Sequence, residues 1–413
     1  MKKRTALIFL LILSLLLLTG CWDYTDYDDL ALISAIGIDL DKNTNEVIVT
    51  LQNYVPSTVS QQSSGKSIPI SGAVKAKGAT FTEALSKIQQ ARRKKLFYAY
   101  LNVVVVGKNA SRKIITDTLR YFERSPNIRT TAYVAIAKGT AEDVLTTMDP
   151  NVSVTIGQDI HGMIDQSPAA GSAFPVSIED FNEKLAISGI EPVAPLVTVK
   201  QTSKSKTDKS SESTEDDGPI KFSKLKEGYQ KINGMAAFKG ENLVGWLNVK
   251  ESTGLGWILN KEMSPYEEVK TFSKNRIQNT IAFSVSKSKS NIKVELVNNK
   301  PVITVDTHIE ANLRKFARDM KVDYLTPDAL TSAENGLADK VKSEIKAAIK
   351  KGQKNLKTDI FGFGFAFYRK YPSLWHSQYE KKWEDTFADI QINVNVEAKI
   401  INTGDSVKKF VPK

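Results

Sequence analysis

The chain has 413 residues, enough for two or three domains, and its 41% hydrophobic and 25% charged residues are typical of a globular protein. The formal net charge is +11 at pH 7, which becomes +8 once Lys2, Lys3 and Arg4 are removed with the leader described below. This surplus suits an anionic membrane face or an acidic polymer, and equally a solvated surface. No nucleic-acid motif accompanies it, and the single cysteine excludes a disulfide within the chain.

Residues 1–20 have the pattern of a secretory signal peptide. A basic start precedes an apolar run over residues 6–18, which is shorter than the ~20 residues of a membrane-spanning helix. The run closes on Leu-Thr-Gly-Cys, ending at Cys21, which resembles the lipobox of bacterial lipoproteins. This resemblance implies that the Cys21 sulfur receives diacylglycerol and that cleavage leaves Cys21 as the mature N-terminus. The alternative is a free or buried cysteine after an ordinary signal peptide. Lipidation is favoured because a lone thiol in an exported chain has no partner.

Residues 21–200 are expected to form an N-terminal α/β-type domain. The pattern predicts a strand, a turn and a return strand over 30–55, and an amphipathic helix over 80–95 with Thr80 and Glu83 as a capping box. The elements expected next are an apolar strand over 96–107, a helix from Ile114 to Phe122, a strand over 130–139, a helix from Thr140, a helix over 177–188 and a strand over 192–200. This alternation predicts a sheet with helices packed on it.

Residues 201–218 contain no large apolar side chain, which predicts a polar linker or mobile loop. A C-terminal α+β domain is expected over 219–413, with a further division near residue 310 as an option. Its expected elements are a hairpin over 231–247, a meander over 279–313 with turns near 289–291 and at 298–300, a long helix over 327–357 and an alternating strand over 389–400. The predicted class is α+β and multi-domain: an N-terminal mixed sheet with packed helices, then a C-terminal antiparallel meander with long helices.

The sequence contains no recognisable catalytic or metal-binding constellation. His161, His308 and His376 are far apart and lack Cys or His neighbours at the spacing of a zinc site, so surface or packing positions are expected. A Gly-x-Ser-x-Gly elbow and a phosphate-binding loop are both missing from the sequence. We therefore expect no catalytic residue, metal or cofactor, and we assign no ligand-binding residue.

Three stretches have both a binding and a structural interpretation. The basic run over 91–95 suits anionic lipid or polymer, but its place at the end of a helix also complements the helix dipole, which is favoured. The Gly-x-Gly within 359–367 follows a helix rather than a strand, so a helix end or packing turn is favoured over a nucleotide site. Trp375, Tyr379 and Trp383 have helical spacing and are expected in the core rather than on a partner surface.

Several segments, taken in order behind the lipobox, resemble the Ger(x)C family, the lipoprotein C subunits of nutrient germinant receptors in spore-forming bacteria. The matching stretches are GCWDYTDYDDLALISAIGID after the leader, EALSKIQQARRKKLFYAYLNVVVVG, FERSPNIRTTAYVAIAKGTAEDVL, GMAAFKGENLVGWLNVKES, and DIFGFGFAFYRKYPSLW followed by Trp383 and Phe387. The linker at 201–218 matches no motif of the family.

The resemblance implies a non-enzymatic subunit, lipid-anchored on the outer face of the inner spore membrane, with an α+β fold of about three domains. It implies two membrane-protein partners, an A subunit and a transporter-like B subunit, in a complex whose binding of nutrient triggers release of ions and dipicolinate. It supplies no catalytic residue, and it leaves open whether this subunit touches the nutrient.

The alternative function is an exported solute-binding lipoprotein or a cell-wall hydrolase. A solute-binding protein should have two similar α/β lobes, whereas the two halves of this chain have different patterns. A hydrolase should bring carboxylates together in one groove, which sequence spacing does not reveal.

Overall fold

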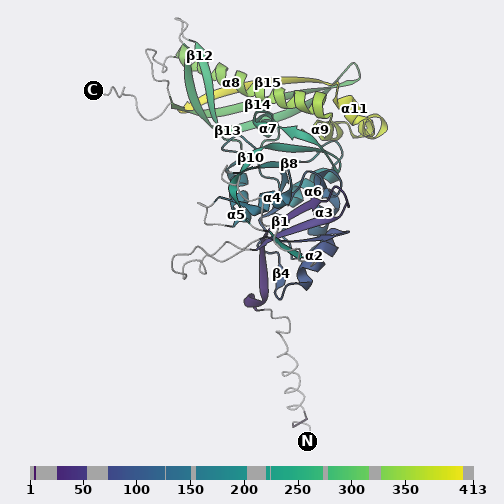
Figure 1. Cartoon of the computed structure of the whole chain (residues 1–413). Coiled ribbons are helices and arrows are strands. Elements are labelled where there is room, and N and C mark those ends of the chain that lie inside the picture. Colours follow the sequence, from purple (N-terminus) through teal and green to yellow (C-terminus); the bar gives the residue numbers. More distant parts are fainter. Residues whose placement is uncertain are drawn as a thin grey trace, which may run out of the picture.

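The computed structural model describes residues 4–5, 26–53, 73–125, 127–149, 155–201, 220–223, 225–272, 278–315 and 327–402. Cys21 and residues 202–218 of the expected linker lie outside these ranges, and Gln201 is the last residue of a strand. Figure 1 shows the large sheet and its helices in the lower part of the molecule and the smaller sheet above them. The C-terminal helices lie beside the smaller sheet. The fold class is α+β, as the sequence predicted.

The large sheet has 11 strands in the described residues and is mixed. Its strands are β1 (Leu30–Leu40), β2 (Val47–Asn53), β3 (Ala73–Gly78), β4 (Lys95–Phe97), β5 (Val103–Val106), β6 (Tyr133–Ala137), β7 (Thr147–Met148), β8 (Val193–Gln201), β9 (Ile220–Ser223), β10 (Lys226–Lys239) and β11 (Asn242–Leu247). The order is β11-β10-β8-β6-β5-β1-β2-β3-β9, with β4 paired to β1 and β7 to β10. Strands β1, β5, β6 and β8 run parallel, and β1 is buried almost throughout.

Helices pack on this sheet as the alternating pattern predicted. They are α2 (Phe81–Gln90), α3 (Ile115–Arg124), α4 (Ala141–Thr146), α5 (Ile156–Gln166) and α6 (Ile178–Ala186), with the short 3-10 helices η1 (Tyr27–Asp29) and η3 (Ala110–Arg112). The expected caps are present: the side chains of Thr80, Thr140 and Ser177 accept hydrogen bonds from the third residue of each helix. Of these three caps, only Ser177 with Asp180 forms the reciprocal box; at α2, the Glu83 carboxylate accepts from the Ala79 N–H instead of the Thr80 N–H.

The smaller sheet contains β12 (Tyr266–Phe272), β13 (Gln278–Val297), β14 (Lys300–Lys315) and β15 (Gln391–Asn402), in that order. Strands β12 to β14 are antiparallel and β15 lies parallel to β14. Helices α7 (Val249–Ile258) and α8 (Pro327–Lys350) pack on each other, and the indole Nε1 of Trp257 donates to the Glu344 carboxylate at 2.9 Å. The remaining elements are η4 (Lys351–Leu356) and η5 (Trp375–Tyr379), both π-helical, with α9 (Phe363–Lys370), α10 (Pro372–Leu374) and α11 (Trp383–Phe387).

Two expected strands differ from the structure. The stretch 96–107 forms two strands, β4 and β5, because a turn at Tyr98–Leu101 lets both pair with successive parts of β1. The expected turn at 289–291 is wrong: β13 continues through it. The side chain of Asn260 holds the polar run in the strand. Its amide nitrogen donates to the Ser290 carbonyl at 2.9 Å, and its amide oxygen accepts from the Ser290 N–H at 2.6 Å. The turn at 298–300 is confirmed, with positive φ at Asn298 and Asn299.

Several elements were not expected from the sequence, among them β3, β9 and the three named next. Helices α2, α6 and α8 end at Gln90, Ala186 and Lys350, earlier than expected. Helices α5 and α7 and strand β12 were missed, although Thr155 with Gln158 and Asn248 with Glu251 are capping boxes. Helix α2 ends at Gln90 rather than 95, so residues 91–95 follow the helix instead of closing it. Strand β14 runs unbroken through residue 310.

Candidate functional site

The predicted lipidation site lies just before the described residues. Asp26 is the fifth residue after Cys21, and its carboxylate accepts a hydrogen bond from the Asp28 N–H at 3.3 Å, which caps η1. Strand β1 begins at Leu30 directly after this turn. In the described residues, no helix is long and apolar enough to cross a membrane. Lipidation of Cys21 remains a prediction.

A buried carboxylate, Asp359, lies where the C-terminal helices meet the large sheet. Its exposed fraction is 1%. Its two oxygens accept five hydrogen bonds, from the backbone N–H groups of Phe361 (3.1 Å), Gly362 (3.0 Å), Phe363 (3.3 Å) and Gly364 (2.7 Å) and from the indole Nε1 of Trp383 (2.8 Å). Burial raises the pKa of Asp359 to about 6, while these donors act to lower it by favouring the carboxylate. The Gly-x-Gly stretch is therefore a packing turn.

The backbone of residues 189–191 completes this junction from the side of the large sheet. The Glu191 N–H donates to the Asp359 carbonyl and the Phe365 N–H donates to the Gly189 carbonyl, both at 2.9 Å. Gly189 has a φ of +83°, and a Cβ there would lie 2.6 Å from the Gly364 carbonyl carbon. Only glycine fits this close approach of two backbones.

Side chains also tie the β10–β11 turn to the junction. The Gly240 N–H donates to the Glu191 carboxylate at 2.6 Å, and Lys239 forms an ion pair with Glu384 of α11. Burial raises the pKa of Glu191 to about 7; the Gly240 N–H opposes this shift, and the nearby charges of Glu384 and Asp359 add to it. We use "the junction" below for residues 189–191, 239–240, 359–364 and 383–384.

A cavity of about 350 Å³ opens beside the junction. Its lining includes Lys184, Glu191, Lys381, Glu384 and Asp385. Small-molecule sites are mostly lined by apolar and aromatic groups, with few polar ones. A charged lining of both signs suits water and ions better than an apolar nutrient.

Aromatic side chains form the core next to the junction. Trp375 and Trp383 are 1% and 3% exposed, and their ring centroids are 5.4 Å apart. Phe367 lies between them and Tyr379, with centroid distances of 5.8 Å to Trp383 and 4.9 Å to Tyr379. The prediction of core packing is confirmed for both tryptophans. Their helical spacing does not correspond to one continuous α-helix, because 375–379 is π-helical and a turn precedes α11.

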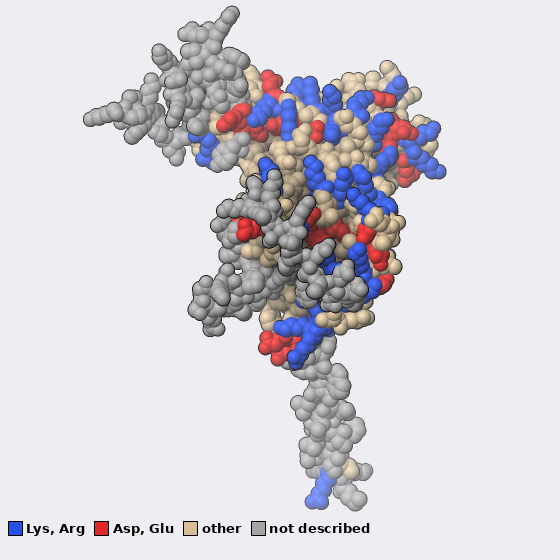
Figure 2. Space-filling view, viewed as in Figure 1, with Lys and Arg blue, Asp and Glu red and all other residues tan. Residues whose placement is uncertain are grey.

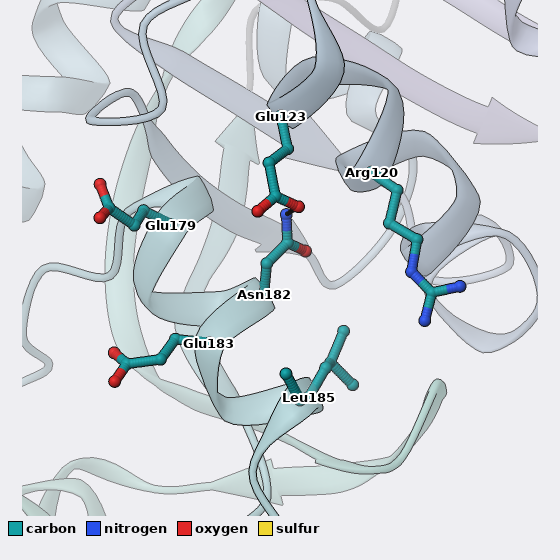
Figure 3. Close-up of a pocket in the computed structure, with 7 residues that line it drawn as sticks. Arg120, Glu123, Glu179, Asn182, Glu183 and Leu185 are labelled. Atoms are coloured by element: carbon teal, nitrogen blue, oxygen red, sulfur yellow. Dashed lines mark hydrogen bonds between the residues drawn. The ribbon is translucent and has the colours of Figure 1, made fainter.

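A second cavity, of about 380 Å³, lies between α3 and α6. Figure 3 shows Asn182 facing Glu123, with Arg120 beside them and Glu179 and Glu183 on the neighbouring turns of α6. The Asn182 amide nitrogen donates to the Glu123 carboxylate at 3.2 Å. This hydrogen bond joins α6 to α3, which is a structural role.

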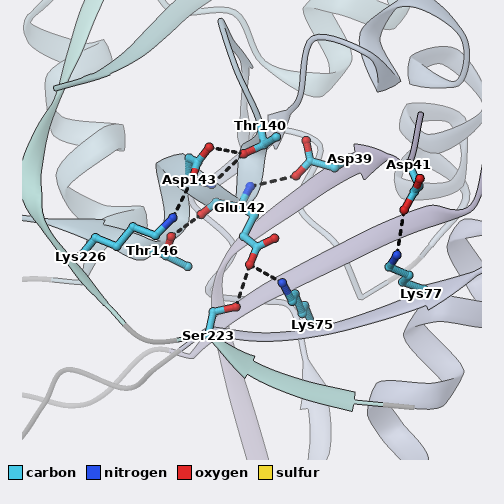
Figure 4. A network of polar contacts seen from close by, with 10 residues as sticks. All are labelled: Asp39, Asp41, Lys75, Lys77, Thr140, Glu142, Asp143, Thr146, Ser223 and Lys226. Atoms are coloured by element: carbon cyan, nitrogen blue, oxygen red, sulfur yellow. Dashed lines mark hydrogen bonds and ion pairs between the residues drawn. The ribbon is translucent and has the colours of Figure 1, made fainter. Parts of the chain in front are cut away.

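A polar network at the start of α4 links several strands of the large sheet (Figure 4). The buried carboxylate of Asp39, on β1, accepts hydrogen bonds from the N–H groups of Ala141 (2.8 Å) and Glu142 (2.9 Å). Burial raises the pKa of Asp39 to about 6, and those two donors act to lower it. Glu142 in turn contacts Lys75 and Ser223, on β3 and β9. The network anchors α4 to the sheet, which is a structural role.

The three histidines are not brought together. His161 stacks on Tyr133 with ring centroids 4.5 Å apart, His308 lies 3.1 Å from Glu397, and His376 lies 3.0 Å from Glu380. In the ranges that the structure covers, no group of three His, Cys, Asp or Glu side chains is placed to hold a metal ion.

Comparisons with known proteins match most of the chain to spore germination proteins. Residues 23–199 match the family model for the spore germination protein N-terminal domain, and residues 233–404 match the model described as spore germination B3/GerAC like, C-terminal. The chain is 27% identical to spore germination protein KC of Bacillus subtilis (strain 168), with 98% of this chain and 97% of that protein covered. It is 26% identical to spore germination protein B3 of the same organism, with 94% and 96% covered. The crystal structure of the GerBC protein matches with a TM-score of 0.52 at 19% identity, covering 89% of this chain and 97% of that one, which shows a shared fold.

Proposed function

Because the chain belongs to the Ger(x)C family of spore germination proteins, whose two domain models together match most of it, we propose that it is the lipid-anchored C subunit of a nutrient germinant receptor. The observation that carries the proposal is the ordered match of both models behind a lipobox-like sequence. The family is not a known enzyme family, and we propose that this member also acts by binding other proteins rather than by catalysis.

Anchoring through Cys21 is supported by the sequence. The apolar run that precedes it is too short to span a bilayer and closes on the lipobox-like Leu-Thr-Gly-Cys. Two acyl chains hold a protein stably because each buried methylene contributes about 0.8 kcal/mol, whereas one chain gives only marginal binding. Such an anchor would keep the folded part at the outer face of the inner spore membrane.

The proposed partners are the A and B membrane subunits of the receptor. The junction supports a subunit that acts as a rigid body, because backbone hydrogen bonds and the buried Asp359 join the large sheet to the C-terminal helices. We propose that residues 21–200 and 219–413 are its two main domains, linked by the polar segment 201–218, with β9, β10 and β11 of the second segment completing the large sheet. Whether the subunit contacts the nutrient is a separate matter, and the charged cavity at the junction does not favour an apolar one.

The alternative, a solute-binding lipoprotein or a cell-wall hydrolase, gains no support from the fold. The described residues form an 11-stranded sheet and a four-stranded sheet of different topology rather than two similar lobes. No observation on either cavity favours a second function.

The experiment that tests the proposal is deletion of the coding sequence, followed by germination of the spores with single nutrients. The proposal predicts loss of response to one nutrient class, with nutrient-independent germination intact. Normal responses to every nutrient, together with a defect in wall breakdown or solute uptake, would replace it with the alternative. Co-purification of the two membrane subunits with the wild-type chain tests the partners separately.

A further inference from the structure

Three exposed basic residues, Arg93, Lys94 and Lys95, lie at the end of the large sheet where the chain enters it. Lys95 begins β4, and its backbone is paired with Leu30, the first residue of β1. In Figure 1, β4 and the start of β1 lie at the lower end, opposite the four-stranded sheet. Figure 2 shows basic and acidic side chains together at this end.

The structural explanation for these basic residues does not hold. Helix α2 ends at Gln90, and the basic residue in its last turn is Lys87, so Arg93 to Lys95 lie outside the range of the helix dipole. Within the described residues, none of the three forms an ion pair, whereas the neighbouring Arg92 is held by a hydrogen bond to the Asn53 side chain at 3.1 Å. Three cations therefore face solvent, and no ion pair within the described part of the chain neutralises them.

Aromatic side chains lie at the same end. Tyr27 of η1 and Tyr100, after β4, are 50% and 43% exposed, which ranks them among the most exposed large hydrophobic residues described. The ring of Phe97 lies 6.4 Å from that of Tyr100. Tyrosine is enriched at membrane–water interfaces because its ring is apolar and its hydroxyl is polar. Asp26, Asp28 and Asp29 are also exposed here and oppose attraction to an anionic surface.

The chain length before η1 fixes how far this end can be from the anchor. Asp26 is the fifth residue after Cys21, and a fully extended chain covers at most about 18 Å over that length. An acylated Cys21 would therefore hold η1, the start of β1 and β4 close to the headgroups, whatever the path of the intervening residues.

We propose that this end of the large sheet is a second membrane contact, in which Arg93, Lys94 and Lys95 bind phospholipid phosphates and Tyr27 and Tyr100 enter the headgroup layer. The inference rests on the proposed lipid anchoring and adds an orientation: the large sheet faces the bilayer and the four-stranded sheet faces away. Because the attraction comes from three cations and is opposed by the carboxylates of Asp26, Asp28 and Asp29, the contact depends on anionic lipid. It weakens with salt, which screens exposed charges over a Debye length of about 10 Å at 0.1 M.

The test uses the full acylated chain in vesicles, with an environment-sensitive fluorophore on an engineered cysteine. Acylation occupies the sulfur of Cys21, so the engineered residue is the only free thiol. One label is placed by Ala91→Cys, an exposed position beside the basic residues, and the control label by Val297→Cys, 50% exposed on the four-stranded sheet. Vesicles contain phosphatidylcholine with phosphatidylglycerol, or phosphatidylcholine alone, and a lipid that carries a quencher in its headgroup region.

We expect quenching at position 91 several-fold above that at 297, larger with phosphatidylglycerol and reduced by salt. Reversing the three charges (R93E, K94E and K95E) should bring quenching at 91 down to the level at 297. A matched variant with K346E, K350E and K399E, all exposed on α8 or β15, has the same net charge and should keep it.

Two failures are distinguishable. A chain that stays in the vesicles with equal, weak quenching at both positions overturns the membrane contact and leaves the lipid anchor standing. A chain that washes off the vesicles, with Cys21 still reactive toward a thiol reagent, overturns the proposed anchoring and removes the premise of the contact.

Discussion

The indole Nε1 of Trp383 donates a hydrogen bond to the Asp359 carboxylate at 2.8 Å, and both groups are buried. This bond links α11 to the turn that precedes α9, at the point where the large sheet meets the C-terminal helices. Buried polar groups of this kind stabilise a fold only while all partners are present, because an unmatched donor loses its bond to water without replacement.

Asp359→Asn should destabilise the protein although it barely changes the side-chain volume. Asparagine presents one acceptor oxygen and an NH₂ group, so N–H donors now facing that group are left unsatisfied, at a cost of about 1–3 kcal/mol each. Denaturant unfolding followed by tryptophan fluorescence measures the loss. The exposed Asp385→Asn serves as the control and should change the unfolding free energy little. Equal stability of both variants would show that the junction does not depend on this carboxylate.

Gly189→Ala should be strongly destabilising. The added Cβ would meet the Gly364 carbonyl carbon and the Phe365 nitrogen at 2.6 Å, and the φ of +83° is unfavourable for alanine. Gly139→Ala is the matched control, because no atom lies within 4 Å of its Cβ position and its φ is not in the left-handed region. Thermal melting should show a large drop for the first variant and almost none for the second. A similar drop for both would remove the close backbone approach as the cause.

Glu191 should make the protein less stable as the pH rises. Its pKa is raised from 4.5 to about 7 in the folded state, chiefly by burial, so the folded state binds the proton more readily than the unfolded state. The stabilisation that comes from proton binding at Glu191 is fully present below pH 4.5 and is lost as the pH rises through 7. Glu191→Gln should therefore flatten the dependence of the unfolding free energy on pH across this window. A variant profile parallel to the wild-type profile would contradict the assignment.

Cys21→Ala should abolish membrane retention and leave the fold intact, because Cys21 precedes η1 and the first strand. Cell fractionation locates the chain, and circular dichroism with thermal melting of the released protein tests its fold. Unfolding of the released variant would show a structural role for the thiol.

Local signals in the sequence were sufficient for much of the fold. The β1–β2 hairpin, the capped helices α4 and α6 and the β10–β11 hairpin depend on neighbouring residues, such as Thr140 with Asp143. The split of 96–107 was hidden because both β4 and β5 are apolar and pair with one distant strand.

The junction was beyond sequence reasoning for the same reason. Asp359, Gly189 and Trp383 meet only through the tertiary fold, and nothing near Asp359 in the sequence indicates that Glu191 donates to its carbonyl. A packing turn at the Gly-x-Gly was the most that spacing supported. Helix α5 has a local signal in the sequence, since Thr155 and Gln158 form a capping box.

The measurement that tests the central claim most directly is dipicolinate release from spores that lack the native chain and carry either the wild-type or the Cys21→Ala protein. Both are exposed to the nutrient whose response the deletion abolishes. The account predicts that the wild-type chain restores release and that Cys21→Ala, although folded, does not. Full release from the Cys21→Ala spores, with the chain absent from the membrane fraction, would contradict a lipid-anchored receptor subunit.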